Sequence, residues 1–118
     1  MSGCYYEKIA RINLTTGQIT VEKLDIDLAK KFIGGRGLGT KILYDEGVAT
    51  ADPLSADNKL VYITGPMTGT LSPSSGRYMV CTKSPLTGMI ACSNSGGIWG
   101  AKLKYAGWDA LIVEGEAP

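Results

Sequence analysis

The chain has 118 residues, of which 16 are glycine and none is histidine, and its formal net charge is +1. Without histidine it cannot supply a Ser-His-Asp triad, a Cys-His dyad or an imidazole ligand for a metal. The weak, scattered charge excludes the basic stripe that is typical of nucleic-acid binding, and the length suits one small domain spanning residues 1–118.

Apolar patterns and the turn residues between them predict the strands. In residues 8–14, Ala10, Ile12 and Leu14 fall on one face, as in a strand with one buried side. Gly17 supplies the left-handed residue of a short hairpin loop that leads into a returning strand. Residues 18–24 are predicted as that returning strand and residues 59–64 as an apolar strand, and residues 77–82, 89–93 and 110–114 are predicted as further strands between turns.

Three short helices lie between these strands. The first is predicted at residues 28–33, with Asp27 as its N-cap and Gly34 at its end. The second covers about 38–46, and the third runs from the break after Gly97 to about residue 105. The fold class that follows is α+β, with a mixed, largely antiparallel sheet built from hairpins and about three short helices.

The three cysteines, Cys4, Cys81 and Cys92, contain no C-x-x-C spacing, so the chain encodes no zinc or iron–sulfur knuckle. Cys81 and Cys92 lie in apolar strand contexts and are expected to be small core residues rather than parts of a disulfide framework. The first residues do not resemble a signal peptide, and the longest apolar run, 60–63, is far too short to span a bilayer. We therefore expect a cytoplasmic protein without a membrane or nucleic-acid partner.

A glycine-rich segment, Gly34-Gly-Arg-Gly-Leu-Gly39, invites a nucleotide-binding interpretation. Its glycines do not have the G-x-G-x-x-G spacing, and the segment follows a predicted helix rather than a strand. Backbone N–H groups at the next helix start could hold an anion. The favoured alternative is a helix–helix corner in which the glycines permit close packing.

The segment Asn94-Ser95-Gly96-Gly97 is the most informative local feature. Ser95 is a plausible cap for the helix that follows, and the two glycines leave the backbone open to a ligand. Arg77 begins the hairpin that Asn94 ends, so both side chains are expected at the same end of the two strands. An arginine fork beside a helix start suits a phosphate, although an ordinary turn and a surface arginine remain the simple alternatives.

Several multi-residue motifs, in register over the whole chain, resemble the start of the tungsten-containing aldehyde ferredoxin oxidoreductases. They include the Ile12–Gly17 hairpin, the Phe32–Gly37 corner and the residues around Arg77. The full set also contains Asp52-Pro-Leu-Ser55, Thr64-Gly-Pro-Met-Thr-Gly69, Thr82-Lys-Ser-Pro-Leu-Thr-Gly88, Asn94-Ser-Gly-Gly97 and Lys104-Tyr-Ala-Gly-Trp-Asp109.

The resemblance implies an oxidoreductase that converts aldehydes to carboxylic acids and passes electrons to ferredoxin. Tungsten, or sometimes molybdenum, would be held by two pterin cofactors (tungstopterin), with Mg²⁺ bridging their phosphates. A [4Fe-4S] cluster would belong to a missing domain or a partner chain. The family's N-terminal domain consists of two similar halves, and this chain resembles the first.

Carried over by position, the resemblance gives Arg77 and Gly96 as pterin contacts. It makes Asn94 a pterin contact whose backbone carbonyl also reaches the Mg²⁺. Ser95 and Gly97 complete the predicted cofactor-binding set, and no catalytic residue is predicted. This set agrees with the phosphate site that hairpin geometry indicates.

Two functions follow for a chain of this length. It is either the cofactor-holding N-terminal piece or small subunit of such an enzyme, inactive alone and paired with the remaining domains or a companion large subunit. Alternatively, it is a stand-alone, non-catalytic pterin-binding protein that pairs with a second copy of itself. A relic without function is disfavoured because such a fragment has no physical need for Arg77 and the Asn94–Gly97 segment.

Overall fold

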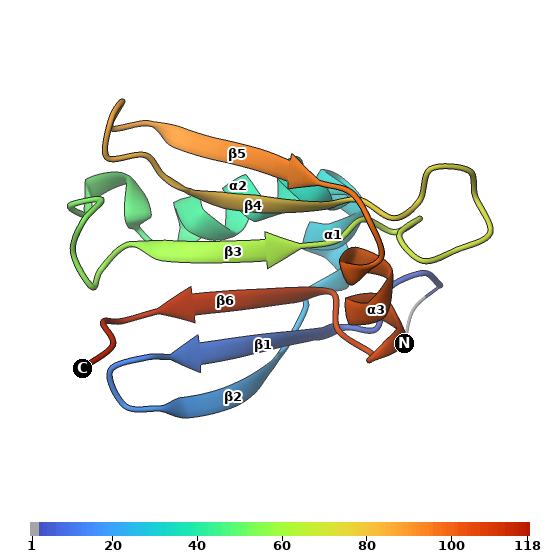
Figure 1. Cartoon of the computed structure of the whole chain (residues 1–118), viewed down its shortest axis with the longest axis horizontal. Coiled ribbons are helices and arrows are strands. Elements are labelled where there is room, and N and C mark those ends of the chain that lie inside the picture. The colour runs from blue at the N-terminus through green and yellow to red at the C-terminus, as the bar shows by residue number, and fades with distance from the viewer. Residues whose placement is uncertain (1–2) are drawn as a thin grey trace.

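The computed structural model describes residues 3–118 and shows one six-stranded sheet in the order β2-β1-β6-β3-β4-β5 (Figure 1). β1 and β6 run parallel, and the other neighbouring strands are antiparallel. This confirms the predicted α+β fold with its mixed, largely antiparallel sheet. The strands are β1 (Lys8–Asn13), β2 (Gln18–Lys23), β3 (Lys59–Ile63), β4 (Tyr78–Lys83), β5 (Ile90–Ser95) and β6 (Ala110–Glu114). The helices are α1 (Ile26–Phe32), α2 (Gly35–Asp45), α3 (Trp99–Tyr105) and the short 3-10 helix η1 (Val48–Thr50).

One face of the sheet carries the hydrophobic core. α1 and α2 lie behind the sheet in the view of Figure 1 and cover this face. Strand alternation directs one side chain in two toward the helices. The core residues are Ile9, Leu24, Ala29, Leu38, Ile42, Leu43, Val48, Val61, Ile63, Cys81, Ala110 and Ile112.

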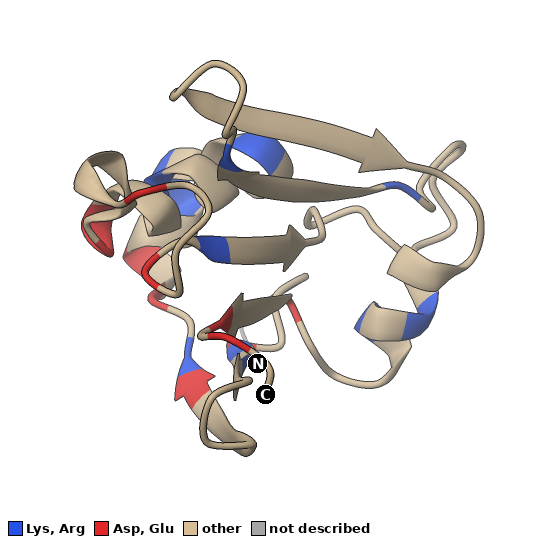
Figure 2. Cartoon of the chain, turned by 60° about the vertical axis from the view of Figure 1, so that its left-hand side comes forward, with Lys and Arg blue, Asp and Glu red and all other residues tan. Residues whose placement is uncertain are grey.

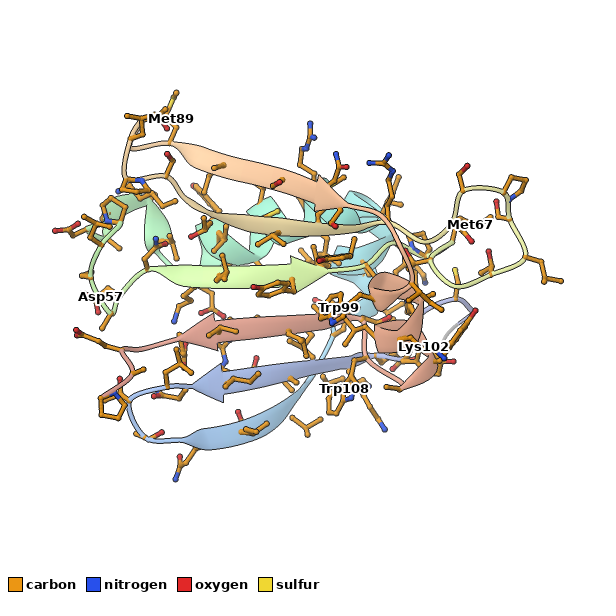
Figure 3. All side chains as sticks on the ribbon, viewed as in Figure 1. Asp57, Met67, Met89, Trp99, Lys102 and Trp108 are labelled. Carbon is orange, nitrogen blue, oxygen red and sulfur yellow. The ribbon has the colours of Figure 1, made fainter. Side chains whose placement is uncertain are left out.

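We call the opposite side of the sheet the open face. α3 lies over one end of it, where the Trp99 ring packs at 4.4 Å from Tyr78 and 5.7 Å from Tyr62, measured between ring centroids (Figure 3). On the same face, at the edge strand β2, Ile19 is 68% exposed and Val21 63% exposed. Along the sheet the open face presents apolar side chains from four neighbouring strands, namely Ile12, Ile19, Val21, Leu60, Leu111 and Val113.

The ends of α1 differ from the prediction. Asp25, not Asp27, is the N-cap, because its Oδ1 accepts the backbone N–H groups of Asp27 at 2.9 Å and Leu28 at 3.3 Å. The helix closes at Ile33, whose φ of +66° is unusual for a β-branched residue, and not at Gly34. The choice of Asp25 starts α1 two residues earlier than the apolar pattern indicates.

α2 begins at Gly35, three residues before the predicted start, so the glycine-rich segment is mostly helical. The N–H of Gly35 donates to the carbonyl of Thr64 at 3.0 Å, which ties the helix start to the end of β3. A Cβ atom at Gly39 would lie 2.9 Å from Cys81 Sγ, and one at Gly37 would lie 2.8 Å from the Phe32 carbonyl oxygen. These glycines let α2 approach β4 and α1 closely, which supports the packing interpretation of the segment.

Five charged residues form what we call the Arg11 cluster, at the end of the sheet away from α3. The Arg11 guanidinium bonds Glu22 at 2.5 Å and Glu114 at 2.8 Å, and also bonds Glu46. Lys59 Nζ lies 2.5 Å from Glu114 and 3.3 Å from Glu46. In Figure 2 acidic and basic segments lie side by side at this end of the molecule. The cluster joins β1, β2, β3, β6 and the residue after α2.

The cluster shifts the pKa values of its members. For Glu46, burial raises the pKa, but the bonds from Arg11 and Lys59 outweigh burial and hold the pKa below its usual range. The hydrogen bond from Lys59 lowers the pKa of Glu114, against the opposing effect of burial, and Arg11 adds to the lowering. Burial lowers the pKa of Lys59, yet its bonds to Glu114 and Glu46 leave that pKa raised.

We expect the stability of the fold to fall in acid because of this cluster. Carboxyl groups whose pKa is lowered in the folded state stabilise the fold at pH values above their unfolded-state pKa of about 4.3. They lose this contribution as the pH falls through their folded-state pKa. Lys59 contributes below about pH 10.4 and loses its contribution as the pH rises through its raised folded value. Denaturant titrations between pH 3 and pH 7 should show the acid loss, and the double substitution Glu46→Gln/Glu114→Gln should flatten it. An unchanged acid slope in that variant would contradict the assignment.

Candidate functional site

The backbone at Arg77 is fixed by a buried threonine. Thr68, 8% exposed, donates from Oγ1 to the Arg77 carbonyl at 3.2 Å, and the same oxygen accepts the N–H of Gly65 at 3.0 Å. A second bond joins the loop to itself, from the Gly69 N–H to the Ser75 carbonyl at 2.8 Å. Arg77 therefore enters β4 from an ordered loop while its side chain stays exposed.

Arg77 and Asn94 meet, as hairpin geometry predicts. The guanidinium Nη1 of Arg77 donates a hydrogen bond to Asn94 Oδ1. The register of β4 and β5 explains this contact, because Tyr78 pairs with Ser95 and Met79 with Asn94. A guanidinium has five N–H donors in a planar fork, so the bond to Asn94 orients the group without exhausting it. An anion could accept from the remaining donors.

Close approach of two loops requires glycine beside this pair. A Cβ atom at Gly76 would lie 2.6 Å from the Gly97 carbonyl oxygen, and one at Gly100 would lie 2.8 Å from the Gly76 carbonyl oxygen. By contrast, a Cβ at Gly96 or Gly97 would meet nothing within 4 Å. The backbone at Gly96 and Gly97 is therefore open to a ligand on the side where a side chain would stand.

The expected helix cap at Ser95 is wrong. Ser95 is the last residue of β5, and α3 begins only at Trp99 after the N-cap residue Ile98, which makes no side-chain cap bond. The β5 ladder continues to Ser95 because Tyr78 lies opposite to pair with it. The site therefore rests on the Arg77 fork and the open loop backbone, and the seven-residue helix α3 adds no argument for anion binding.

A mostly apolar cavity of about 330 Å³ adjoins Arg77. Ile33, Met67 and Met79 are among the residues that line it, together with Gly65 from the loop after β3. A charged fork at the rim of an apolar hollow suits a ligand with an anionic group attached to a flat or apolar body.

A larger cavity, about 640 Å³, lies at the other end of the sheet. Glu46, Lys59 and Glu114 line it, and these side chains already bond one another within the Arg11 cluster. Paired charges of this kind stabilise the fold and leave little free binding capacity, so we place the site at Arg77 and Asn94.

Within residues 3–118 no group of three or more His, Cys, Asp or Glu side chains is arranged to hold a metal ion. In the same residues no helix has the length and apolar character needed to cross a membrane.

The family model described as aldehyde ferredoxin oxidoreductase, N-terminal domain, matches residues 9–118. This chain belongs to the aldehyde ferredoxin oxidoreductase N-terminal domain family. The tungsten-containing aldehyde ferredoxin oxidoreductase of Pyrococcus abyssi is 56% identical over 113 residues, which cover 96% of this chain and 19% of that protein. The "aliphatic sulfonate oxidoreductase, WOR-like subunit" of Pyrococcus furiosus is 36% identical over 116 residues, covering 96% of this chain and 18% of that protein.

A solved structure shows the same fold. It is the active site complex BamBC of benzoyl coenzyme A reductase with 1,5-dienoyl-CoA, which matches at a TM-score of 0.96 and 34% identity. The match covers 100% of this chain and 18% of that chain. The aldehyde ferredoxin oxidoreductase N-terminal domain represented here thus spans about a fifth of the length of its curated relatives.

Sequence reasoning missed the residues that support the site of this family member. Thr68, which anchors the Arg77 backbone, and Gly100, which admits the Gly76 carbonyl, lie in segments that read as an ordinary turn and helix. The sequence predicts that Gly76 leaves the backbone beside Arg77 open to a ligand, but in the structure the space of its missing side chain is taken by the carbonyl of Gly97, 21 positions further along the chain. A close contact between two loops becomes visible only when both are placed in space.

Proposed function

We propose that this chain is the cofactor-holding N-terminal part of a tungsten or molybdenum bis-pterin oxidoreductase that oxidises aldehydes to carboxylic acids, with ferredoxin as electron acceptor. The observation that carries the proposal is the Arg77–Asn94 pair beside the open backbone of Gly96 and Gly97. Membership of the aldehyde ferredoxin oxidoreductase family, with 56% identity to a tungsten-containing member, supports this cofactor class.

In this proposal the chain binds and orients the cofactor. The Arg77 guanidinium, which Asn94 orients, donates hydrogen bonds to a pterin phosphate. The backbone N–H groups of Gly96 and Gly97 approach the same anion. Ser95 offers a hydroxyl at the end of β5. When bound, the metal–pterin centre supplies the two-electron oxidation, and the residues of this chain hold its phosphate end in place.

Mg²⁺ would be held by oxygen. Amide and backbone carbonyls are ligands that this ion accepts. Asn94 provides a backbone carbonyl on β5, which is an edge strand of the sheet and so presents one side of its backbone to no neighbouring strand. We assign the Mg²⁺ contact to that carbonyl because the Asn94 side-chain oxygen already accepts from Arg77.

The remaining machinery would come from other domains or a companion large subunit. We place the [4Fe-4S] cluster there because Cys4, Cys81 and Cys92 are too far apart in sequence to form a cluster-binding motif. The open face supports such a partner, since Ile19 and Val21 are more than half exposed on a broad apolar surface. Burial of these side chains against a second protein surface would be favourable.

Substitution of Arg77 tests the proposal. In the chain purified with its native partner, Arg77→Ala should lower the affinity for the pterin cofactor about 10- to 100-fold, because a charge-assisted hydrogen bond to phosphate is lost. The measurement is the tungsten, molybdenum and magnesium content per chain, with pterin quantified after extraction. Lys31→Ala, which removes one exposed positive charge from α1, is the matched control and should leave the content unchanged. Full metal and pterin content in Arg77→Ala would contradict the assignment of Arg77 as a pterin contact.

The open face also favours a second candidate, a stand-alone pterin-binding protein that pairs with another copy of itself. Two open faces would then cover each other and bury Ile19 and Val21 without any companion subunit. Light scattering on the purified chain separates the candidates. A dimer that binds added pterin cofactor supports pairing, and a strict monomer that ignores the cofactor supports the need for a large partner.

A further inference from the structure

Cys81 on β4 and Cys92 on β5 face each other across the hairpin that carries Arg77 and Asn94. They are register partners, and the Cys92 thiol donates to Cys81 Sγ over a sulfur–sulfur distance of 3.1 Å. Both are free thiols.

The strands already hold these cysteines at a separation that a disulfide accepts. Directly opposed residues of antiparallel strands have Cα atoms about 4.5–5.5 Å apart, within the range of about 4.4–6.8 Å for disulfides. The sulfurs would need to close from 3.1 Å to about 2.05 Å, which small side-chain rotations accomplish without moving the strands.

The two thiols differ in access. Cys81 is fully buried beneath Gly39 of α2, and burial raises the pKa of its thiol to about 12. Cys92 is only half-buried and has the Thr40 hydroxyl 3.7 Å from its sulfur. An oxidant therefore reaches Cys92 first, and Cys81 is placed to react second with whatever forms on the Cys92 sulfur.

We propose that Cys81 and Cys92 are a redox modification site, which hydrogen peroxide converts into a disulfide across β4 and β5. The Cys92 thiolate attacks the peroxide oxygen and forms a sulfenic acid, and the other peroxide oxygen leaves as water after protonation. The Cys81 sulfur then attacks the Cys92 sulfur, so that the S–S bond forms as the S–O bond breaks, and the proton of the Cys81 thiol passes to the sulfenic oxygen, which leaves as a second water. Two thiols lose two electrons and two protons, and hydrogen peroxide is reduced to two waters.

The disulfide would fasten the hairpin close to the candidate site. Met79 and Asn94 are the next pair of partners on the same side of the two strands, toward Arg77. The inference does not depend on the proposed cofactor function, because it rests on the two thiols and their register alone.

Hydrogen peroxide treatment of the full chain tests the site. A Cys4→Ser background removes the exposed thiol that would otherwise link two chains. We expect the mass of two hydrogen atoms to be lost, a peptide joining Cys81 and Cys92 in a non-reducing digest, and both thiols to resist alkylation in denaturant. The thermal midpoint Tm should rise by about 10 °C and return to its starting value with a dithiol reductant.

The matched control is Cys4→Ser/Cys92→Ser, which keeps a similar volume at the half-buried position and should show neither the bridge nor the rise in Tm. Two outcomes would overturn the proposal. In one, both thiols stay alkylatable after peroxide. In the other, Cys92 proceeds to a sulfinic acid while Cys81 remains a free thiol, which would mean that the second attack does not occur.

Discussion

Replacing Asp109 with alanine is expected to lower the free energy of unfolding by about 3–5 kcal/mol, because it leaves a buried ammonium without its counter-charge. Asp109 and Lys104 are each 3% exposed, and Lys104 Nζ lies 2.5 Å from Asp109 Oδ1. The same carboxylate accepts the backbone N–H groups of Tyr6 at 3.2 Å, Glu7 at 2.7 Å and Lys8 at 3.3 Å. One side chain thus fixes the entry to β1 against the end of α3.

Denaturant unfolding of three variants tests this role. Asp109→Asn keeps the shape and one acceptor oxygen, so its loss should be smaller than that of Asp109→Ala. Lys104→Met/Asp109→Leu removes both charges and should be more stable than Asp109→Ala alone. If Asp109→Ala lowers the free energy of unfolding by less than about 1 kcal/mol, the ion pair of Lys104 and Asp109 is not a major source of stability.

Gly76→Ala is expected to have the second large effect, a loss of about 1–3 kcal/mol in the free energy of unfolding. The added methyl would meet the Gly97 carbonyl oxygen at 2.6 Å, and a backbone oxygen cannot rotate away as a flexible side chain can. Either the loop before β4 or the loop after β5 must shift. Because Arg77 follows Gly76 directly, the bond between Arg77 and Asn94 should loosen as well.

Gly96→Ala is the matched control, since a methyl there meets nothing within 4 Å. Its free energy of unfolding should stay within about 0.5 kcal/mol of the parent protein. In the cofactor-loaded complex the expectation differs, because the methyl would occupy the space that the proposed ligand uses. Equal destabilisation by Gly76→Ala and Gly96→Ala would mean that the contact between the loops is not the cause.

The strands could be predicted from local sequence, because residues 8–14 alternate apolar with polar residues and the other strands are short segments bounded by turn residues. The hairpin at Gly17 and the joining of Arg77 to Asn94 follow from the same logic, since a hairpin brings its two ends together. The choice of β6 as the neighbour of both β1 and β3 has no local signal. It depends on which edges remain available after the hairpins form.

Helix starts were harder to predict for a physical reason. Glycine has poor helix propensity, so Gly35 and Gly37 favour a corner before a helix that starts at about residue 38, whereas in the structure both belong to α2 and lie close to Thr64 and Phe32. The burial of Lys104 also could not be predicted from local sequence. Lys104 is a charged residue that sequence alone would place at the surface, and its burial depends on Asp109.

The central position of β6 has a consequence for how the protein is made. In the sheet formed by residues 3–118, the β1–β2 hairpin joins the other strands only through β6, the latest of the six strands in sequence order. Contacts such as that between Lys8 and Asp109 link residues 101 positions apart. During synthesis on the ribosome, the edges of β1 and β3 that pair with β6 therefore remain unpaired until β6 emerges and inserts between them. Folding should be slow and cooperative for a domain of this size. The unpaired edges of β1 and β3 are the sites where we expect aggregation to begin.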